Sequence, residues 1–155
     1  MISVISNSAD ETVALGAKLA KFLKKGDVVT LSGDLGAGKT LFVSGLLSFY
    51  NMKDEVSSPT FTIVNEYDLK EDLKLFHFDV YRLNSPEEFL AIGGEEFFEQ
   101  GICLIEWGEM IEEFLPNDVL KIKIEKHPEE NNKRKFSFSC NSSKFDELMR
   151  EAVAK

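Results

Sequence analysis

A glycine-rich segment near the start of the chain carries the residue types that hold a chain of phosphates. Its glycines let the backbone curl so that successive N–H groups point inward at an anion. The lysine would place an ammonium between two phosphates, and the threonine hydroxyl would ligate Mg²⁺. Eight consecutive residues match the pattern Gly-x-x-x-x-Gly-Lys-Thr at every fixed position: Gly33, Asp34, Leu35, Gly36, Ala37, Gly38, Lys39 and Thr40.

The sequence on either side of this phosphate loop supports a nucleotide site. Residues 27–31 form a short apolar run with β-branched side chains, which is typical of a buried strand. Apolar residues then recur at helical spacing from Leu41 to Tyr50. The order strand, glycine loop, helix is the context in which this motif binds phosphates. The alternative, a glycine-rich turn whose lysine faces water, leaves Thr40 unexplained.

Two acidic residues stand near the ends of predicted strands, where a phosphate-loop enzyme needs a carboxylate. Glu106 follows the apolar run 102–105, and Asp79 lies near the end of the predicted strand 73–80. Either would serve on chemistry alone. Because the run 102–105 is typical of a strand buried on both faces, we assign Glu106 to the metal and Asp79 to orienting water or phosphate. The competing interpretations are an ion pair of Asp79 with Arg82 and a solvent-facing Glu106.

Three further features lie close to these acids in the sequence. His77 would share one side of a strand with Asp79, and it is better explained as a hydrogen-bonded structural histidine than as a base. Trp107 would pack against a moving loop, a partner or the core. The hydroxyl groups of residues 57–60 would respond to the presence of a γ-phosphate. The competing interpretation is a simple turn.

The remaining hydrophobic patterns complete an α/β fold. A capping box at Ser8 starts a helix that should end near Gly26. The order of the elements predicts a P-loop NTPase-like three-layer sandwich with a mostly parallel central sheet plus antiparallel strands. The other predicted strands cover residues 1–5, 61–67, 119–124 and the region of 136–138, and the other predicted helices start near 86, 95, 110 and 143.

Composition limits the class of protein. At 155 residues the chain is the size of one domain, residues 1–155. Its formal charge of −9 repels a polyanion and argues against a nucleic-acid binder that uses its whole surface. A basic group near one predicted hairpin is read as a solvated strand face. It comprises Lys121, Lys123, Lys126, Lys133, Arg134 and Lys135.

Cysteine usage and hydropathy predict a compartment. The two cysteines, Cys103 and Cys140, resemble neither metal ligands nor a bridge. The N-terminus lacks a signal-peptide pattern, and no stretch approaches the roughly 20 apolar residues that span a membrane. We therefore expect a cytoplasmic protein with no membrane partner.

Four motifs together resemble one family. The phosphate loop is followed by Ser-Pro-Thr-Phe at 58–61, His-Phe-Asp-Val-Tyr-Arg-Leu at 77–83, and Glu-Trp at 106–107. This combination spans nearly the whole chain and resembles the TsaE family, bacterial ATPases of tRNA threonylcarbamoyladenosine biosynthesis. The resemblance implies an ATPase that uses ATP and Mg²⁺ and supports the proteins TsaB and TsaD. That pair transfers the threonylcarbamoyl group, so tRNA would be reached indirectly.

The resemblance also carries roles to individual residues. Lys39 and Thr40 match the family's phosphate and magnesium residues, Asp79 its essential aspartate, and Glu106 its magnesium-associated glutamate. Trp107 matches a tryptophan near the site.

The rest of the nucleotide pocket is less clearly marked. Leu41 departs from the pattern, because many members have a second hydroxyl there, and contact with the α-phosphate would fall to backbone N–H groups. By family position, Asp10, Glu11 and Arg134 would line the adenine pocket.

Other functions remain open at this stage. A small-molecule kinase would use the same loop but usually has an arginine-bearing lid, and the only arginines are Arg82, Arg134 and Arg150. A GTPase is disfavoured because no Asn-Lys-x-Asp segment occurs. A nucleotide-gated binding protein, with hydrolysis only as a reset, overlaps the ATPase interpretation.

Overall fold

The computed structural model describes residues 1–34, 36–52 and 63–154. Within these ranges the strands are β1 (Ile2–Ser6), β2 (Val28–Ser32), β3 (Val64–Asp68), β4 (Lys74–Asp79), β5 (Ile102–Glu106), β6 (Leu120–Lys126) and β7 (Arg134–Ser139). The α-helices are α1 (Ala9–Ala20), α2 (Lys39–Ser48), α3 (Glu87–Ala91) and α4 (Asp146–Val153). Three 3-10 helices complete the described part: η2 (Val80–Arg82), η3 (Gly94–Glu99) and η4 (Gly108–Phe114).

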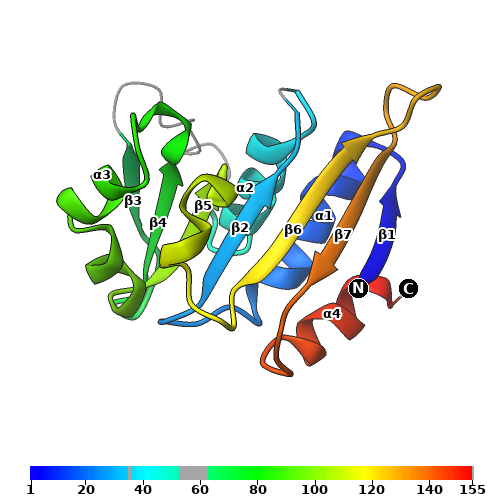
Figure 1. Cartoon of the computed structure of the whole chain (residues 1–155). Coiled ribbons are helices and arrows are strands. Elements are labelled where there is room, and N and C mark those ends of the chain that lie inside the picture. The colour runs from blue at the N-terminus through cyan, green and yellow to red at the C-terminus, as the bar shows by residue number, and fades with distance from the viewer. Residues whose placement is uncertain (35, 53–62, 155) are drawn as a thin grey trace.

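The strands form one sheet of seven in the order β1-β7-β6-β2-β5-β4-β3 (Figure 1). The four central strands β6, β2, β5 and β4 are mutually parallel. Antiparallel pairing adds β3 at one edge, and β7 followed by β1 at the other. The predicted α/β fold with a mostly parallel centre and antiparallel strands is therefore confirmed. The carboxyl ends of the four parallel strands lie at the same end of the sheet, so polar side chains from several strands can meet there.

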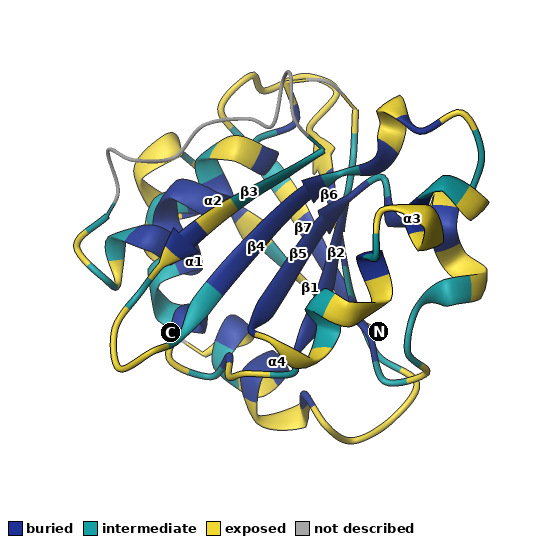
Figure 2. Cartoon of the chain, turned by 90° about the vertical axis from the view of Figure 1, so that its left-hand side faces the viewer, coloured by how far each residue is buried: buried dark blue, intermediate teal, exposed yellow. Residues whose placement is uncertain are grey.

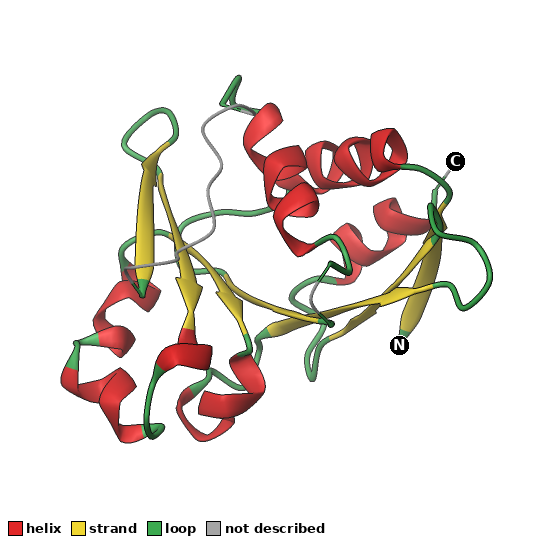
Figure 3. Ribbon diagram, turned by 90° about the horizontal axis from the view of Figure 1, so that it is seen from above, coloured by secondary structure: helices red, strands yellow, loops and turns green. Residues whose placement is uncertain are grey.

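Helices cover both faces of the sheet and make the three predicted layers (Figure 3). On one face, α1, α2 and α4 bury a core with the inward side chains of β2, β5, β6 and β7. On the other face, α3, η3 and η4 pack on a smaller core rich in phenylalanine. Figure 2 shows the consequence, since β4 and β5 are buried almost throughout while the short helices are exposed on their outer sides.

Two glycines allow α1 and α2 to touch closely, which fixes the helix that follows the phosphate loop. A side-chain carbon added at Gly16 would lie 2.6 Å from the carbonyl oxygen of Phe42, and one at Gly45 would lie 2.3 Å from that of Val13. Real side chains never approach backbone this closely, so a larger residue would push the two helices apart. The loop-bearing end of α2 is thereby held against the rest of the fold.

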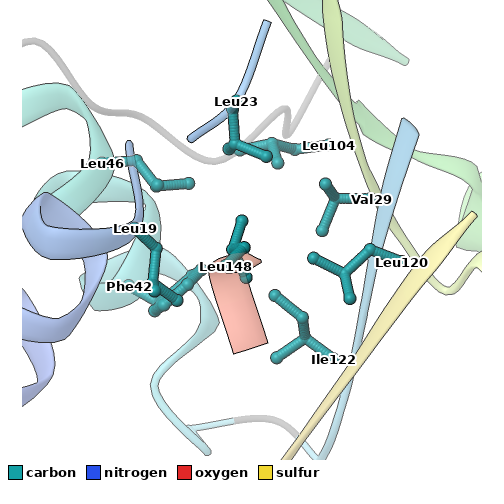
Figure 4. A pocket seen from close by; sticks show the side chains of 9 residues that line it. All are labelled: Leu19, Leu23, Val29, Phe42, Leu46, Leu104, Leu120, Ile122 and Leu148. Carbon is teal, nitrogen blue, oxygen red and sulfur yellow. The ribbon is translucent and has the colours of Figure 1, made fainter. Parts of the chain in front are cut away.

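The larger core contains one small void between α1, α2, α4 and the sheet (Figure 4). Its volume is about 10 Å³. The void is too small and too apolar to hold an ordered water or a ligand. It is lined by Leu19, Leu23, Val29, Phe42, Leu46, Leu104, Leu120, Ile122 and Leu148.

Several element boundaries differ from the sequence predictions. The predicted cap is present, because the Ser8 hydroxyl accepts from the Glu11 N–H, while the Glu11 carboxylate accepts the N–H of Asn7 in place of that of Ser8. However, α1 ends at Ala20 and not near Gly26. After Ala20 the chain tightens, because the Phe22 and Leu23 N–H groups donate to the carbonyls of Leu19 and Ala20, three residues back. The buried Asp27 carboxylate then accepts the Lys24 N–H at 2.8 Å.

Two later helices also differ. The helix predicted over residues 110–115 is the kinked 3-10 segment η4, and the kink falls at Ile111, whose side chain is buried. The helix predicted from residue 143 starts at Asp146. The antiparallel hairpin of 61–67 with 73–80 is confirmed in β3 and β4, with residues 61 and 62 outside the described ranges.

Candidate functional site

The polar residues singled out in the sequence meet at the carboxyl edge of the parallel strands. In β5, Glu106 lies opposite Leu31 of β2 on one side and opposite Asp79 of β4 on the other. Neighbouring strands are only about 4.8 Å apart, so the two carboxylates stand side by side. The phosphate loop leaves β2 at the same edge. The fold thus brings together groups that are separated by up to 73 residues in the sequence.

The phosphate loop has the backbone that its glycines predict. Gly33, Gly36 and Gly38 all have positive φ angles, and Gly38 caps the start of α2. At Gly33 a side chain would meet the carbonyl oxygen of Ile124 at 2.4 Å, so β6 leaves room only for glycine. Asp34 is exposed and its carbonyl accepts the Ala37 N–H, while Leu35 lies outside the described residues.

Lys39 is the first residue of α2, and its ammonium is folded into the loop. The side chain is only 7% exposed. Its Nζ donates to the carbonyl oxygen of Gly33 at 2.7 Å and lies 3.8 Å from Oε1 of Glu106. The same ammonium sits 4.6 Å from the ring centroid of Trp107, a cation–π contact. The Lys39 ammonium therefore interacts with a carboxylate, a carbonyl and an aromatic face at once.

Glu106 is a buried carboxylate with two different neighbours. It is 7% exposed, so the solvent-facing interpretation of this residue is wrong. Its Oε2 lies 2.6 Å from Nε2 of His77, which is fully buried, while Oε1 faces Lys39. The prediction that His77 is hydrogen-bonded is confirmed, and its partner is the acid that we assigned to the metal.

Asp79 ends β4 and starts the 3-10 helix η2. Its Oδ1 accepts the N–H of Tyr81 at 3.1 Å, and the residue is half-buried. Among the described residues, Asp79 and Arg82 form no ion pair, so that competing interpretation is wrong. The ring of Tyr81 lies 4.9 Å from that of Trp107 and is 61% exposed. An aromatic pair therefore leads from the Lys39 ammonium to the surface.

The donor set fits Mg²⁺ bound together with a nucleotide. Thr40, the second residue of α2, offers a hydroxyl, and Glu106 offers Oε1, which lies beyond hydrogen-bond distance of Lys39. In the described part of the chain, no three His, Cys, Asp or Glu side chains cluster to form a metal cage. Mg²⁺ typically binds through one or two carboxylates and completes its shell with water and substrate phosphates.

The end of the β6–β7 hairpin brings two cations to the loop. Lys126 and Arg134 are partners in the strand register. Arg134 Nε donates to the carbonyl of Ala37 at 2.9 Å, and Lys126 Nζ lies 3.1 Å from where a side chain on Gly36 would start. The interpretation of this basic group as a solvated strand face is therefore incomplete, because two of its members lie against the phosphate loop. A surface hollow of about 300 Å³ lies here, lined by Gly33, Asp34, Ala37, Lys123, Ile124, Glu125 and Lys126.

The other predicted nucleotide residues lie on α1 and α2, near the same end of the sheet. β1 ends with Ser6 opposite Arg134, and α1 starts three residues later. Asp10 and Glu11 are exposed in the first turn of α1, where Glu11 accepts the Asn7 N–H. Leu41 is half-buried in α2. The predicted sensing segment 57–60 and the Ser-Pro-Thr-Phe motif lie outside the described residues.

Comparison with known proteins agrees with this arrangement. The family model for "Threonylcarbamoyl adenosine biosynthesis protein TsaE" matches residues 6–136 of the chain. The chain belongs to the TsaE family. The TsaE match contains the phosphate loop, both strand-end acids, Trp107 and Arg134. The family's name in turn assigns the chain to tRNA threonylcarbamoyladenosine biosynthesis.

Individual TsaE relatives are similar over most of their length. The TsaE protein of Bacillus subtilis is 42% identical over 142 residues, covering 92% of this chain and 87% of that protein. The TsaE protein of Treponema pallidum is 42% identical over 121 residues, covering 77% and 88%. The crystal structure of YdiB from Bacillus subtilis superimposes with a TM-score of 0.75 at 35% identity, covering 98% of this chain and 95% of that one.

In the described part of the chain, no helix is both long enough and apolar enough to cross a bilayer. The contacts of the site that the sequence did not predict include Lys126 against Gly36 and Trp107 over Lys39. The first had a signal in the sequence, because Lys126 and Arg134 flank the predicted hairpin symmetrically. The second had none.

Proposed function

We propose that this TsaE protein binds ATP with Mg²⁺, hydrolyses it slowly, and acts in threonylcarbamoyladenosine biosynthesis through the TsaB–TsaD complex. The observation that carries the proposal is the register of β4, β5 and β2. It sets Asp79 and Glu106 side by side at the strand ends, next to a complete phosphate loop. A nucleotide-binding loop without hydrolysis would not need two such acids.

Each residue has a distinct role in this proposal. Lys39 exchanges the carbonyl of Gly33 for phosphate oxygens when the nucleotide enters the loop. Thr40 and Glu106 would hold Mg²⁺, which would supply positive charge to offset the negative charge of the phosphates. Asp79 orients the attacking water from the end of β4. The loop N–H groups and the start of α2 surround the phosphates.

The proposal places the nucleoside at the hairpin side of the loop. Arg134 already contacts the loop there, and α1 starts beside it, so Asp10, Glu11 and Arg134 would line the adenine pocket. At Leu41 the backbone N–H would contact the α-phosphate. ATP is preferred over GTP because no Asn-Lys-x-Asp segment occurs in the sequence.

Slow hydrolysis by the isolated chain follows from the place of its arginines. An arginine that reaches the γ-phosphate accelerates phosphoryl transfer strongly. Arg134, the arginine in contact with the loop, donates to the backbone oxygens of Ala37, Asn131 and Lys133. A partner would therefore supply the missing stabilisation, and the net charge of −9 favours a protein partner over direct tRNA binding. We place this assembly in the cytoplasm.

The deciding experiment is an ATPase assay of the purified chain with TsaB and TsaD added or omitted. We expect slow turnover alone and faster turnover with the pair. Fast turnover that the pair leaves unchanged would contradict the proposal. Turnover that responds instead to a small hydroxyl-bearing acceptor would identify a kinase.

Four variants test the division of roles by titration of ATP with and without Mg²⁺. Lys39→Ala and Thr40→Ala should lose productive use of ATP. Glu106→Ala should weaken the dependence on Mg²⁺ more than nucleotide binding, and Asp79→Ala should spare binding but depress turnover. Equal loss of binding in all four variants would rule out these separate roles.

A second candidate, nucleotide-gated binding with hydrolysis only as a reset, is favoured by one contact. The Lys39 ammonium lies over the ring of Trp107, and the Trp107 ring contacts the exposed ring of Tyr81 in a tilted arrangement. Movement of Lys39 to a phosphate would change a surface that a partner can read. Partner binding that follows nucleotide occupancy but is indifferent to Asp79→Ala would favour this candidate over the ATPase.

A further inference from the structure

His77 is the buried neighbour of the acid at the site. It lies in β4, two residues before Asp79 and on the same face, and it is fully buried. Asp79 lies opposite Glu106, so His77 is the diagonal neighbour of Glu106 across two parallel strands. The distance between His77 Nε2 and Glu106 Oε2 is 2.6 Å, which is a short hydrogen bond to a charged group.

The other ring nitrogen shows which way this hydrogen bond runs. Within the described residues, Nδ1 of His77 is buried and has no hydrogen-bond partner. If Nδ1 carried the ring proton, it would be a buried donor without an acceptor. This costs more free energy than a buried acceptor nitrogen without a donor. The ring proton therefore sits on Nε2, and His77 donates to Glu106.

This hydrogen bond divides the two oxygens of the Glu106 carboxylate. Oε2 is held by His77, and Oε1 is turned toward Lys39 at 3.8 Å. The terminal torsion of a glutamate is soft, so a carboxylate without a fixed partner would rotate toward the Lys39 ammonium. His77 leaves one oxygen in a defined place facing the phosphate loop.

We propose that His77 is a positioning residue that fixes the carboxylate of Glu106, so that Oε1 is presented to the metal bound with the nucleotide. The inference rests on the proposed function of Glu106 as the acidic partner of Mg²⁺. A hydrogen-bond partner of a metal-binding carboxylate fixes the orientation of that carboxylate toward the metal. The competing account is that His77 only fills the core.

Two substitutions at His77 separate these accounts, because both replace the imidazole ring with a polar amide but differ in how far the amide reaches. In His77→Gln the amide nitrogen can occupy the place of Nε2 and donate to Glu106. In His77→Asn the shorter amide lies near the place of Nδ1 and cannot reach. A matched control is Phe76→Leu, the preceding residue of β4, which is buried on the opposite face and touches Phe97.

The measurement is the affinity for Mn²⁺ in the presence of a non-hydrolysable ATP analogue, read from the electron paramagnetic resonance of free Mn²⁺. We expect His77→Asn to bind Mn²⁺ about tenfold to a hundredfold more weakly. His77→Gln should recover most of that loss, and Phe76→Leu should lose thermal stability with unchanged Mn²⁺ affinity. The same order should appear in the Mg²⁺ concentration that ATP hydrolysis requires.

The outcomes distinguish this inference from the proposed function. If wild type binds Mn²⁺ with the analogue but folded His77→Asn binds equally well, the inference falls and the proposed function stands. If His77→Gln and His77→Asn bind Mn²⁺ equally weakly, the inference is also overturned. If wild type shows no metal-dependent nucleotide binding, the proposed function itself fails.

A measurement on the wild-type chain covers the case in which His77→Asn does not fold. The Nε2–H of His77 is buried against a carboxylate and should give a slowly exchanging, downfield proton resonance. Glu106→Gln should shift that resonance upfield. The other histidine, His127, is exposed and should give none. Absence of the resonance in wild type would overturn the inference.

Discussion

Two clusters of charge, each built around a buried carboxylate, lie at opposite ends of the central strands. At the carboxyl end is the site cluster, which consists of Lys39, His77 and Glu106. At the amino end of β2 is a second group, the amino-end cluster, which consists of Asp27, Asp118 and Lys144. Both clusters hold a nearly buried carboxylate within 4 Å of a lysine ammonium. They differ in how completely their polar atoms are paired.

The amino-end cluster is fully paired around Asp27, which is 1% exposed. Oδ2 accepts the Lys24 N–H at 2.8 Å, and Oδ1 lies 3.3 Å from Lys144, which also lies 3.3 Å from Asp118. Burial lowers the pKa of Lys144, but its hydrogen bond with Asp118 and the charge of Asp27 outweigh burial and raise that pKa. This cluster ties together the chain segments that directly precede β2, β6 and α4.

The site cluster is paired less well. Glu106 Oε1 has its ammonium at 3.8 Å, outside hydrogen-bond distance, and the described residues offer Nδ1 of His77 no partner. A buried charge that is fully paired serves the fold, whereas one with spare bonding capacity can serve a ligand. The comparison predicts that changes in the site cluster affect turnover and changes in the amino-end cluster affect stability.

The largest expected effect is that of Lys39→Ala. We expect ATP turnover in the presence of TsaB and TsaD to fall by about 100-fold or more, because a charge-stabilising donor to the phosphates is lost. The melting temperature should fall less than in Asp27→Ala, because Glu106 keeps its hydrogen bond with His77. Lys144→Ala is the matched control and should show the reverse pattern. A Lys39→Ala protein with normal turnover would break the comparison.

Asp27→Ala should have the largest effect on stability. It leaves the Lys24 N–H and the Lys144 ammonium without their shared partner, and the expected loss is roughly 2 to 4 kcal/mol. For a chain of this size the melting temperature should fall by roughly 5 to 15 °C. Calorimetry measures the loss, and turnover per folded molecule should be unchanged. A loss of turnover in fully folded protein would contradict a purely structural role.

A turn far from both clusters offers a stabilising change. Glu71 and Asp72 both have positive φ angles, and the Leu73 N–H donates to the Lys70 carbonyl, which is the geometry of a type I′ turn. Asn and Gly suit these positions better, so Glu71→Asn with Asp72→Gly should stabilise the chain by about 1 kcal/mol. Denaturant unfolding would measure it.

The same double variant sharpens the comparison, because it raises stability without touching the site. Its Mg²⁺ requirement should equal that of wild type. If the Mg²⁺ requirement of the double variant differs from that of wild type, a change in stability is enough to alter the site. The His77 variants would then be compared with this double variant.

The smallest expected effect is a change in thiol labelling next to the amino-end cluster. Burial raises the pKa of the Cys103 thiol to about 12, so almost none of it is thiolate at neutral pH. Its backbone N–H donates to the Asp27 carbonyl at 2.9 Å. Iodoacetamide should label the half-buried Cys140 first, and Asp27→Ala should speed the labelling of Cys103 while Lys39→Ala should not. Peptide mass spectrometry distinguishes these results, and equal labelling rates in both variants would contradict the prediction.

Local patterns in the sequence predicted much of the fold and the main residues of the site. The loop motif, the helix cap at Ser8 and the apolar run before Glu106 each depend on neighbours a few residues away, and each appears in the structure. The end of α1 could not be predicted this way. There the hydrogen bonds shift to residues three apart and the Leu23 side chain enters the core shared with α2 and the sheet, a contact that long-range packing decides.

Contacts between strands were beyond the reach of sequence patterns for the same reason. His77 meets Glu106 across 29 residues because β4 and β5 are parallel neighbours in one particular register. Arg134 meets Ala37 across 97 residues because the β6–β7 hairpin ends beside the loop. Periodicity reveals which face a residue occupies, but strand order and register determine its partner.

The sequence by itself determined that this protein has a phosphate loop, two acids at strand ends and a family, because those depend on residue types at short spacing. Only the tertiary structure decided how the charges are paired. It held one oxygen of Glu106 with His77, turned the other toward Lys39, and paired both oxygens of Asp27. The reason is physical, since the bonding of a buried polar atom depends on every segment packed around it.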